Sequence, residues 1–405
     1  MNGDTSHKKL EMKPVDVMHL EQYDELLRYV FQVDTADLEE SGYEDKELQQ
    51  AKRPILKRSE VIGWFNDEQL VSSLSIYPCK VNIHGQTYDM AGLTGVGTYP
   101  EFANQGLMNQ LILEALQKMR KNKQWISYLY PFSIPFYRHK GWEIISDHMT
   151  FTINDTQLPK TVEVSGHVER QDIDHADVYS TYTEFALQNH GALIRNAWDW
   201  EEYWRWENEE ERTAAIYYDN QNKPTGYVLY WIKNDIFHIK EMIYLTQNAR
   251  KGLWNFITAH LSMVEKVEGH TYKNEPIAFQ LEDSKIEETI EPYYMARIID
   301  VKEFLLRYPF EKKNTAFHFN VIDNHADWNN NIFSVSWDNH GKIQITNDAI
   351  GSEIIIDIQT LTCMLMSYRR PAYFQKIERI NIAQETLELL EDVLPKSQPY
   401  FSDYF

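Results

Sequence analysis

The chain has 405 residues, with 61 Asp and Glu against 40 Lys and Arg, so its formal net charge is −21. This length exceeds what one ordinary hydrophobic core organises, and we expect two or three domains. The acidic balance argues against nucleic acid as the main partner, because phosphate contacts require clustered Lys and Arg. It favours cationic small molecules or basic peptides, although a charge that only keeps the protein soluble explains it equally well.

The two cysteines, Cys79 and Cys363, lie in different regions and form neither a disulfide framework nor a zinc motif. This usage suits a reducing cytoplasm. The histidines are scattered without metal-ligand spacing, so no metal is expected. We see no signal peptide and no apolar run long enough to span a bilayer, which predicts a cytoplasmic protein without a membrane partner.

A helix is predicted near residues 20–31, because its apolar side chains recur on one face. A second helical stretch, 35–52, is rich in Glu and Asp. Glu39 and Glu40 within it are candidates to meet a cationic substrate, although a solvated acidic face is the commoner explanation of such residues. An antiparallel meander of three strands then follows, at 61–65, 70–78 and 88–98.

The stretch that organises the chain begins within the last of these strands. Residues 93–98 are small and apolar, as in a buried strand, and Pro100 ends the strand because proline cannot donate to a sheet. A turn over 101–105 leads to Gly106, which opens an amphipathic helix. The apolar face of that helix comprises Leu107, Leu111, Ile112, Ala115, Leu116 and Met119.

A strand at 125–130 follows this helix, and the segment FYRHKGW at 136–142 then closes the unit with a helical turn, a glycine stop and a third strand. The first N–H groups of a helix have no internal partner, and the helix dipole adds positive charge there, so the turn before Gly106 is a candidate anion site. A merely structural turn is the commoner explanation of a lone glycine.

The order of strand, glycine turn, helix, strand and FYRHKGW resembles that of the GCN5-related N-acetyltransferases. In that family the turn binds the pyrophosphate of acetyl-CoA and reads Arg/Gln-x-x-Gly-x-Gly/Ala. The matching positions here are Ala103, Gly106 and Met108, so only the central glycine is kept.

The segment from 156 to 284 has the pattern of a second copy. Residues 246–252 take the place of the phosphate turn and lead into a helix near 253–264, but they lack the strand–Pro–turn–Gly layout. We interpret this segment as a degenerate repeat that supplies walls and no chemistry. Its other predicted elements are helices at 178–189 and 198–206 and strands at 213–218, 226–232 and 237–244.

The last segment changes character. A strand at 295–301 and a helix at 302–307 precede strands near 317–322, 332–337, 342–346 and 353–356 and helices near 358–367 and 385–393. The chain ends in Pro399-Tyr400-Phe401-Ser402-Asp403-Tyr404-Phe405, which is aromatic where a terminus is normally polar. Burial of three rings is worth several kcal/mol at about 25 cal/mol per Å². We therefore expect the tail to be docked, with its terminal carboxylate in a fixed place.

Together these features resemble the Eis-like (enhanced intracellular survival) acetyltransferases over essentially the whole chain. The most specific marks are FYRHKGW, the YMARIIDVKEFL strand–helix and the aromatic C-terminus. The resemblance implies an α+β fold with tandem GCN5-related acetyltransferase domains, the second degenerate, followed by a sterol-carrier-protein-like α/β domain. The predicted domains are an active acetyltransferase domain at 1–155, the degenerate copy at 156–284 and the sterol-carrier-like domain at 285–405.

The same resemblance implies the site. Tyr137 is the general acid, and the C-terminal carboxylate of Phe405 is the general base. A homo-oligomer, often a hexamer, is also implied. The residues expected to contact acetyl-CoA are Val96, Gly97 and Thr98 on the strand, Asn104, Gln105, Gly106, Leu107, Met108 and Asn109 at the turn, and Phe132 and Ser133 after the next strand.

The chemistry requires groups of these kinds. A protonated amine cannot attack a thioester, so a base must remove a proton, and a hydroxyl can protonate the leaving thiolate. The resemblance and the acidic charge together imply direct transfer of acetyl from acetyl-CoA to a primary amine of an aminoglycoside, a polyamine or a lysine side chain. The alternative is a non-catalytic protein that binds acyl-CoA or a lipid.

Overall fold

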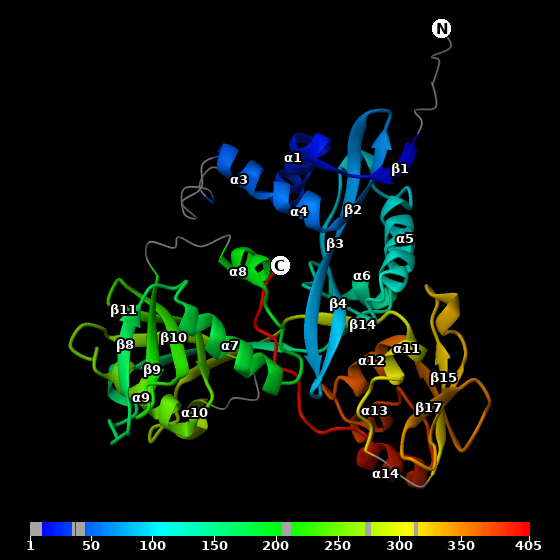
Figure 1. Ribbon diagram of the computed structural model, residues 1–405. Helices are drawn as coiled ribbons and strands as arrows, with labels where there is room; N and C mark the ends of the chain where they lie inside the picture. Colours follow the sequence, from blue (N-terminus) through cyan, green and yellow to red (C-terminus); the bar gives the residue numbers. More distant parts are fainter. Residues whose placement is uncertain (1–9, 35–36, 38–44, 205–211, 272–276, 312–314) are drawn as a thin grey trace.

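A computed structural model describes residues 10–34, 37, 45–204, 212–271, 277–311 and 315–405. Three sheets organise these residues, and helices cover their faces, so the fold is α+β as predicted (Figure 1). Glu39 and Glu40 lie outside the described residues. No helix in the described part of the chain is both long and apolar enough to cross a membrane.

The first sheet has seven strands in the order β1-β2-β3-β4-β5-β14-β6. Helix α1 (Leu20–Phe31) covers one face through Tyr23 and Leu26, and α5 (Leu107–Lys121) covers the other through Leu111 and Leu116. The strands are β1 (Leu10–Pro14), β2 (Glu60–Asn66), β3 (Gln69–Ile83), β4 (Gln86–Thr98), β5 (Ile126–Leu129), β14 (Met295–Ile298) and β6 (Glu143–Ile144). The shorter helices of this part are α3 (Asp45–Ala51), α4 (Arg53–Arg58) and α6 (Ile134–His139).

The second sheet also has seven strands, in the order β13-β7-β12-β11-β10-β9-β8. Its two faces bear α7 (Ala176–Gln188) and α9 (Gln247–Thr258), whose apolar sides form separate clusters. The strands are β13 (Glu287–Pro292), β7 (Asp147–Asn154), β12 (Lys266–Thr271), β11 (Ile236–Tyr244), β10 (Pro224–Lys233), β9 (Thr213–Tyr218) and β8 (His167–Gln171), and two further helices are α8 (Ala197–Trp204) and α10 (Ile277–Gln280).

Three strands lie in sheets other than the ones that the predicted domain boundaries imply. Strand β14, expected to begin the third domain, pairs with β5 and β6 in the first sheet. Strands β7 and β13, expected in the first and third domains, pair with each other in the second sheet. The predicted boundaries at 155/156 and 284/285 therefore do not coincide with the edges of the sheets. No local pattern in the sequence identifies strand partners that lie this far apart.

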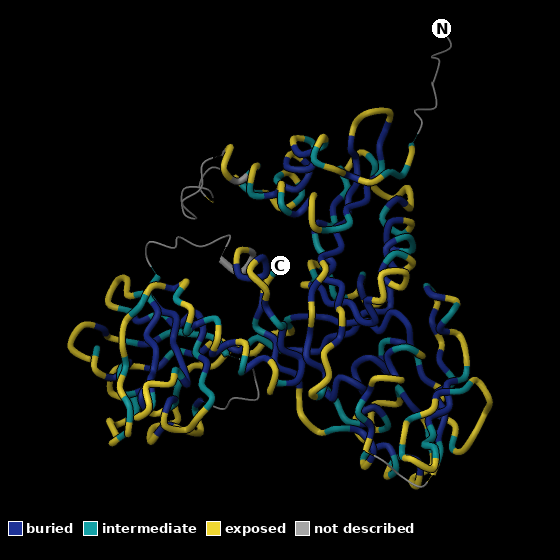
Figure 2. The backbone as a smooth tube through the Cα atoms, in the orientation of Figure 1, coloured by how far each residue is buried: buried dark blue, intermediate teal, exposed yellow. Residues whose placement is uncertain are grey.

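The third sheet has four strands in the order β17-β16-β15-β18. Its core is continuous with that of the first sheet: the Tyr88 hydroxyl on β4 donates to the Phe304 carbonyl at 3.1 Å, and Figure 2 shows buried chain running between the two parts. The elements are β15 (Phe317–Ile322), β16 (Ile332–Trp337), β17 (Ile343–Thr346), β18 (Ser352–Asp357), α11 (Val301–Leu305), α12 (Ile358–Leu365), α13 (Pro371–Lys376) and α14 (Gln384–Val393).

The C-terminal tail after α14 leaves the third domain and packs against the other two, as its aromatic composition predicted. Tyr400 is buried in the core of the second domain, and its N–H donates to the His190 carbonyl at 2.7 Å. Phe401 is buried in the core shared by the first and third domains. The tail therefore contacts all three domains.

A buried ion pair joins β14 to the third domain. The Arg297 guanidinium lies 2.6 and 2.8 Å from the two carboxylate oxygens of Asp323, and neither side chain is exposed. Arg297 also donates to the Lys140 carbonyl at 2.7 Å. These contacts tie β14 to the segment after β15 and to the end of α6.

We expect Arg297→Met to destabilise the protein by about 3–5 kcal/mol, because it leaves the Asp323 carboxylate buried without its cation. The matched control is Arg307→Met, which breaks the more exposed pair with Glu303 and costs about 0–1 kcal/mol. Thermal unfolding followed by circular dichroism compares the two. Equal stability of the variants would contradict the role given to Arg297.

Candidate active site

A fork between two parallel strands forms the centre of the first domain. Strands β4 and β5 pair only from Met90 opposite Ile126 to Gly92 opposite Tyr128. Beyond Gly92, β4 continues to Thr98 with no strand beside that edge among the described residues. Backbone N–H and C=O groups on this edge are therefore available to a ligand.

The other edge of this part of β4 is held by serine hydroxyls from β3. Ser72 donates to the Gly97 carbonyl at 3.0 Å, and Ser73 donates to the Gly95 carbonyl at 3.1 Å. Gly95 has a φ of +59° beside a register shift, and a Cβ there would lie 2.8 Å from the Ser75 hydroxyl. The predicted residues Val96, Gly97 and Thr98 thus occupy a strand segment that is fixed on one edge and open on the other.

The turn before α5 has the geometry of an anion site. Asn104 and Gly106 have positive φ values of 60° and 78°, and Gly106 is the N-cap without a capping side chain. The first internal hydrogen bond of the helix runs from Gln110 N–H to the Gly106 carbonyl at 3.2 Å. The N–H groups of Leu107, Met108 and Asn109 therefore precede the helical hydrogen-bond pattern. A Cβ built on Gly106 meets nothing within 4 Å, so the approach is open.

Lys140 brings a positive charge to this helix end, and the sequence analysis missed it. Its side-chain nitrogen lies 2.5 Å from the Asn109 amide oxygen and 3.4 Å from the ring nitrogen Nε2 of His325. Burial lowers the pKa of Lys140. In the sequence, Lys140 is marked only by its place in FYRHKGW, and nothing in that segment indicates that its charge lies near the start of α5.

Tyr137, the predicted general acid, lies on α6 directly after β5. The residue is 2% exposed, and its ring packs edge-to-face against Phe132 and Phe136 at centroid distances of 5.5 and 5.1 Å. Ser133 is the N-cap of α6 and accepts the Phe136 N–H at 3.4 Å. Burial raises the pKa of Tyr137, so its hydroxyl stays protonated at neutral pH.

Phe405, the predicted base, lies at the fork. Its N–H donates to the buried Tyr294 hydroxyl at 3.1 Å, and its ring covers Gly92, where a Cβ would lie 2.7 Å from the ring. The Tyr77 ring is 6.3 Å away and the Tyr294 ring 5.3 Å. The terminal residue is thus held where β4 and β5 separate, on the strand that also carries Val96 to Thr98.

Helix α8 supplies a carboxylate beside this fork. Trp198 packs on Tyr77 at 4.7 Å, and the adjacent Asp199 accepts the Asn196 N–H at 2.8 Å and approaches the Cys79 thiol at 3.8 Å. Burial is the main cause that raises the pKa of Asp199, to about 7, and the negative charge of Asp403 adds to it. The aromatic run around Trp198 indicated core packing, which its 4% exposure agrees with, but nothing in the sequence indicated a perturbed carboxylate.

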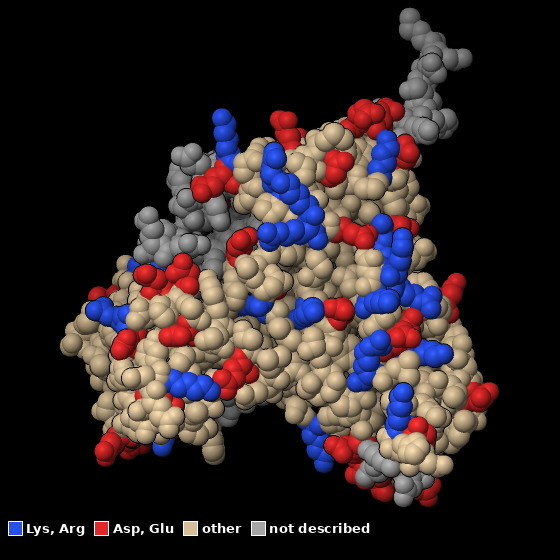
Figure 3. All heavy atoms as spheres, in the orientation of Figure 1, with Lys and Arg blue, Asp and Glu red and all other residues tan. Residues whose placement is uncertain are grey.

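Basic and acidic side chains are interleaved in small groups on the face seen in Figure 3. Among the described residues, no three His, Cys, Asp or Glu side chains lie so that they could hold a metal ion.

Asp199→Asn should change how stability depends on pH. Because the folded-state pKa is about 7 and the unfolded value is about 3.9, this carboxyl contributes stability that is complete below about pH 4 and lost as the pH rises through 7. The Asn variant should therefore melt at a higher temperature than the wild type at pH 8 and lose this advantage near pH 4. The exposed Asp89→Asn is the control, and an unaltered pH profile for Asp199→Asn would contradict the assignment.

Models of known protein families match three parts of the chain. An acetyltransferase (GNAT) domain matches residues 11–145, another acetyltransferase (GNAT) domain matches 191–298, and a sterol carrier protein domain matches 301–402. A sequence search of curated proteins finds no significant match.

Solved structures resemble the chain over nearly its full length. A conserved protein of unknown function from Enterococcus faecalis V583, described as a probable N-acyltransferase, is 29% identical with a TM-score of 0.89, over 98% of this chain and 100% of its own. A GCN5-related N-acetyltransferase from Anabaena variabilis ATCC 29413 shares the fold at 22% identity and a TM-score of 0.84, over 98% and 100% of the chains. Eis1 from Mycobacterium abscessus shares it at 15% identity and 0.80, also over 98% and 100%.

Two GNAT domains, a sterol carrier protein domain and a full-length likeness to these structures agree with one another and with the fork, turn and tail described above. The chain is an acyltransferase of the GCN5-related N-acetyltransferases, with the Eis-like arrangement of three domains.

Proposed function

We propose that this enzyme transfers the acetyl group of acetyl-CoA directly to a primary amine of a cationic acceptor. The observation that carries the proposal is the position of Phe405, whose ring covers Gly92 and whose N–H is bound by Tyr294 at the fork of β4 and β5. A chain terminus held at a catalytic fork brings a carboxylate to the place where an amine must lose a proton.

The first domain fits acetyl-CoA as co-substrate. The N–H groups from Gln105 to Asn109 bind the pyrophosphate at the open start of α5, where anions are favoured. The free edge of β4 at Val96, Gly97 and Thr98 binds the pantetheine arm through backbone hydrogen bonds, and Phe132 and Ser133 border it. Lys140 supplies the positive charge that Ala103 lacks in place of the family's arginine.

Tyr137 acts as the general acid. Its neutral hydroxyl donates a proton to the coenzyme A thiolate as the carbon–sulfur bond breaks. A backbone N–H near Gly97 or Thr98 stabilises the negative charge that develops on the carbonyl oxygen during attack. Both groups belong to elements that meet at the fork, the strand β4 and the helix that follows β5.

The Phe405 carboxylate takes the proton of the acceptor ammonium, directly or through water. A free α-carboxyl has a pKa of about 3.5, so it is ionised at neutral pH and also attracts a cationic amine. The net charge of −21 favours an acceptor with several positive charges, such as an aminoglycoside, a polyamine or a lysine side chain. Glu39 and Glu40 stay candidates for binding it.

Three further expectations belong to this proposal. The chain acts in the cytoplasm, as its cysteine usage indicates, and it assembles into a homo-oligomer, for which the resemblance suggests a hexamer. It requires neither a metal nor nucleic acid.

The alternative is a non-catalytic acyl-CoA or lipid-binding protein. The third domain is the candidate lipid site, but its inward side chains Phe317, Phe319 and Ile354 are fully buried in the core shared with the first domain. This packing favours a structural role for the domain and leaves the enzyme as the better-supported function.

The direct test of function is coenzyme A release from acetyl-CoA with a panel of aminoglycosides, polyamines and basic peptides. Tyr137→Phe should lower kcat by about 10²–10⁴-fold, because a general acid contributes that much. Tyr217→Phe is the matched control, since it removes another buried hydroxyl from the second domain. Equal kcat values for the Tyr137 variant and the control would refute the acid role.

Removal of Phe405 alone should abolish turnover while coenzyme A still binds, as measured by calorimetry. A chain extended by one glycine keeps the ring of Phe405 but moves the carboxylate, and it should lose turnover as well. Phe405→Tyr keeps both ring and carboxylate, and it should stay active. Full activity of the glycine-extended chain would show that the carboxylate is not the base.

A further inference from the structure

The second domain repeats the fork of the first. Strands β11 and β12 run parallel and pair from Ile236 opposite Lys266 to Ile239 opposite Gly269, and β11 then continues to Tyr244. A register shift against β10 follows at once, between Leu229 and Tyr230, as one does in β4. The second domain therefore retains the strand fork at which the first domain would hold its thioester.

The anion site beside this second cleft is closed. Thr246 caps α9, and its hydroxyl oxygen accepts the Ala249 N–H at 3.1 Å, which uses a group that a phosphate would need. Gly252 is buried against the Tyr217 ring, where a Cβ would lie 2.3 Å away. The geometry of the fork thus survives without the means to bind a pyrophosphate.

The chain's own tail enters this cleft. Tyr400 and Ser402 line it together with Ile239 and Glu241 of β11. Tyr400 is 6% exposed, and its ring packs edge-to-face on Phe185 at 4.9 Å. The tail then passes from the second fork towards the first, where it ends at Phe405.

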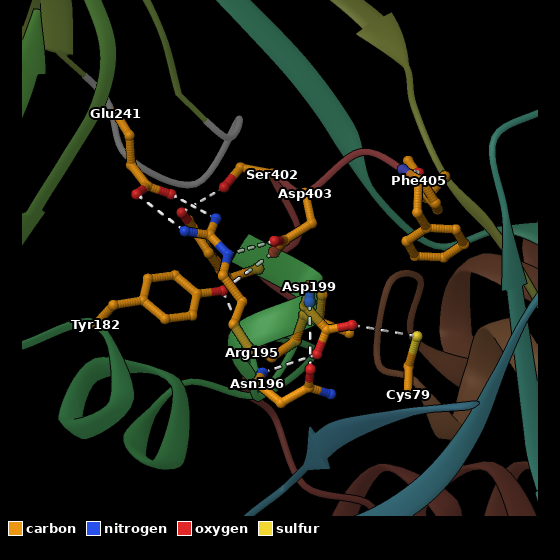
Figure 4. A network of polar contacts seen from close by, with 12 residues as sticks. Cys79, Tyr182, Arg195, Asn196, Asp199, Glu241, Ser402, Asp403 and Phe405 are labelled. Atoms are coloured by element: carbon orange, nitrogen blue, oxygen red, sulfur yellow. Dashed lines mark hydrogen bonds and ion pairs between the residues drawn. The ribbon is translucent and has the colours of Figure 1, made fainter. Parts of the chain in front are cut away.

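Arg195 links Glu241 on β11 to Asp403 in the tail (Figure 4). Its guanidinium lies 2.8 Å from the Glu241 carboxylate and 2.5 Å from that of Asp403, and its side chain is fully buried. Tyr182 places its ring 3.7 Å from the guanidinium and donates its hydroxyl to Asp403 at 3.0 Å, while Tyr227 donates to Glu241 at 2.6 Å. One buried cation and two hydroxyls therefore compensate two buried carboxylates.

This network selects a single register of the tail. A buried charge without its partner is strongly unfavourable, so Asp403 must stay opposite Arg195. A slip of the tail by one residue would separate them and would move the terminal carboxylate by about 3.5 Å. Two tyrosines also hold the main chain of the tail in this register. Tyr293 donates to the Asp403 carbonyl at 2.8 Å, and Tyr294 accepts the Phe405 N–H.

We propose that the fork of the second domain is a binding site for the C-terminal tail, and that Arg195 is the positioning residue that sets the Phe405 carboxylate through Asp403. The remnant of a cofactor cleft thus serves the active site of the first domain. The inference rests on the proposed function for its catalytic consequence, but the binding of the tail is a separate property.

Two variants test the proposal in the full-length protein. Arg195→Met and Asp403→Asn each remove the charge contact, and the second keeps the domain core intact if the first fails to fold. Each should lower kcat by at least about 10-fold, because small misplacements of a reacting group have such effects. The KM for acetyl-CoA should change less than about twofold, because neither residue touches the first fork's cofactor-binding edge.

The second readout is independent of catalysis. Carboxypeptidase A removes an accessible C-terminal phenylalanine, and mass spectrometry follows the loss of Phe405. Both variants should lose it at least about 10 times faster than the wild type, because the tail opens more often. Arg250→Met, on α9 of the same domain, is the control and should behave as the wild type in both assays.

The outcomes separate the two claims. Wild-type rates of Phe405 removal in both variants would overturn the tail-binding site, and a released tail with unchanged kcat would overturn the positioning role. If the wild type transfers acetyl to no acceptor, the proposed function fails, while faster removal of Phe405 in the variants still supports the binding site.

Discussion

The separation of β4 from β5 beyond Gly92 is the constraint on which the structure depends. A buried sheet normally pairs its backbone groups, so an open edge in its centre needs either a ligand or protection. Serine hydroxyls of β3 fix the strand from one side, and α1 and α5 cover its faces. The edge that is left open faces the fork, and the ring of Phe405 lies across its beginning at Gly92.

The other domains can be understood from what this fork requires. The third domain shares its core with the first, and Tyr294, which precedes β14 of the first sheet, binds the terminal N–H. The second domain keeps a fork of its own but has closed the adjoining anion site with Thr246. Its remaining cleft holds the middle of the tail, with Arg195 and Glu241 opposite Asp403. The first sheet, through Gly92 and Tyr294, and the second domain, through Arg195, thus hold the end of the tail.

Local patterns were enough to predict much of this fold. The glycine turn at Gly106 and the apolar faces of α1 and α5 depend on spacing, and the structure confirms them. Tyr137 and Phe405 were identified through the resemblance to a family, because a lone tyrosine and a terminal carboxylate carry no pattern of their own. The roles given to them stay predictions.

Features that depend on distant partners were missed. Strands β7, β13 and β14 pair in sheets other than the expected ones, and their sequences do not differ from those of strands that pair within their own domain. The ionisation of Asp199 and the charge of Lys140 near α5 follow from burial and from neighbours on other elements. The contact of Arg195 with Asp403 joins residues 208 positions apart, and no window of sequence contains both.

The most direct measurement is a crystal structure of the protein with coenzyme A and a polyamine. We expect the pyrophosphate at the start of α5 beside Gly106, the sulfur within hydrogen-bond reach of the Tyr137 hydroxyl, and an amine nitrogen beside the Phe405 carboxylate. Coenzyme A bound in the fork of the second domain, or a terminal carboxylate turned away from the sulfur, would contradict this expectation.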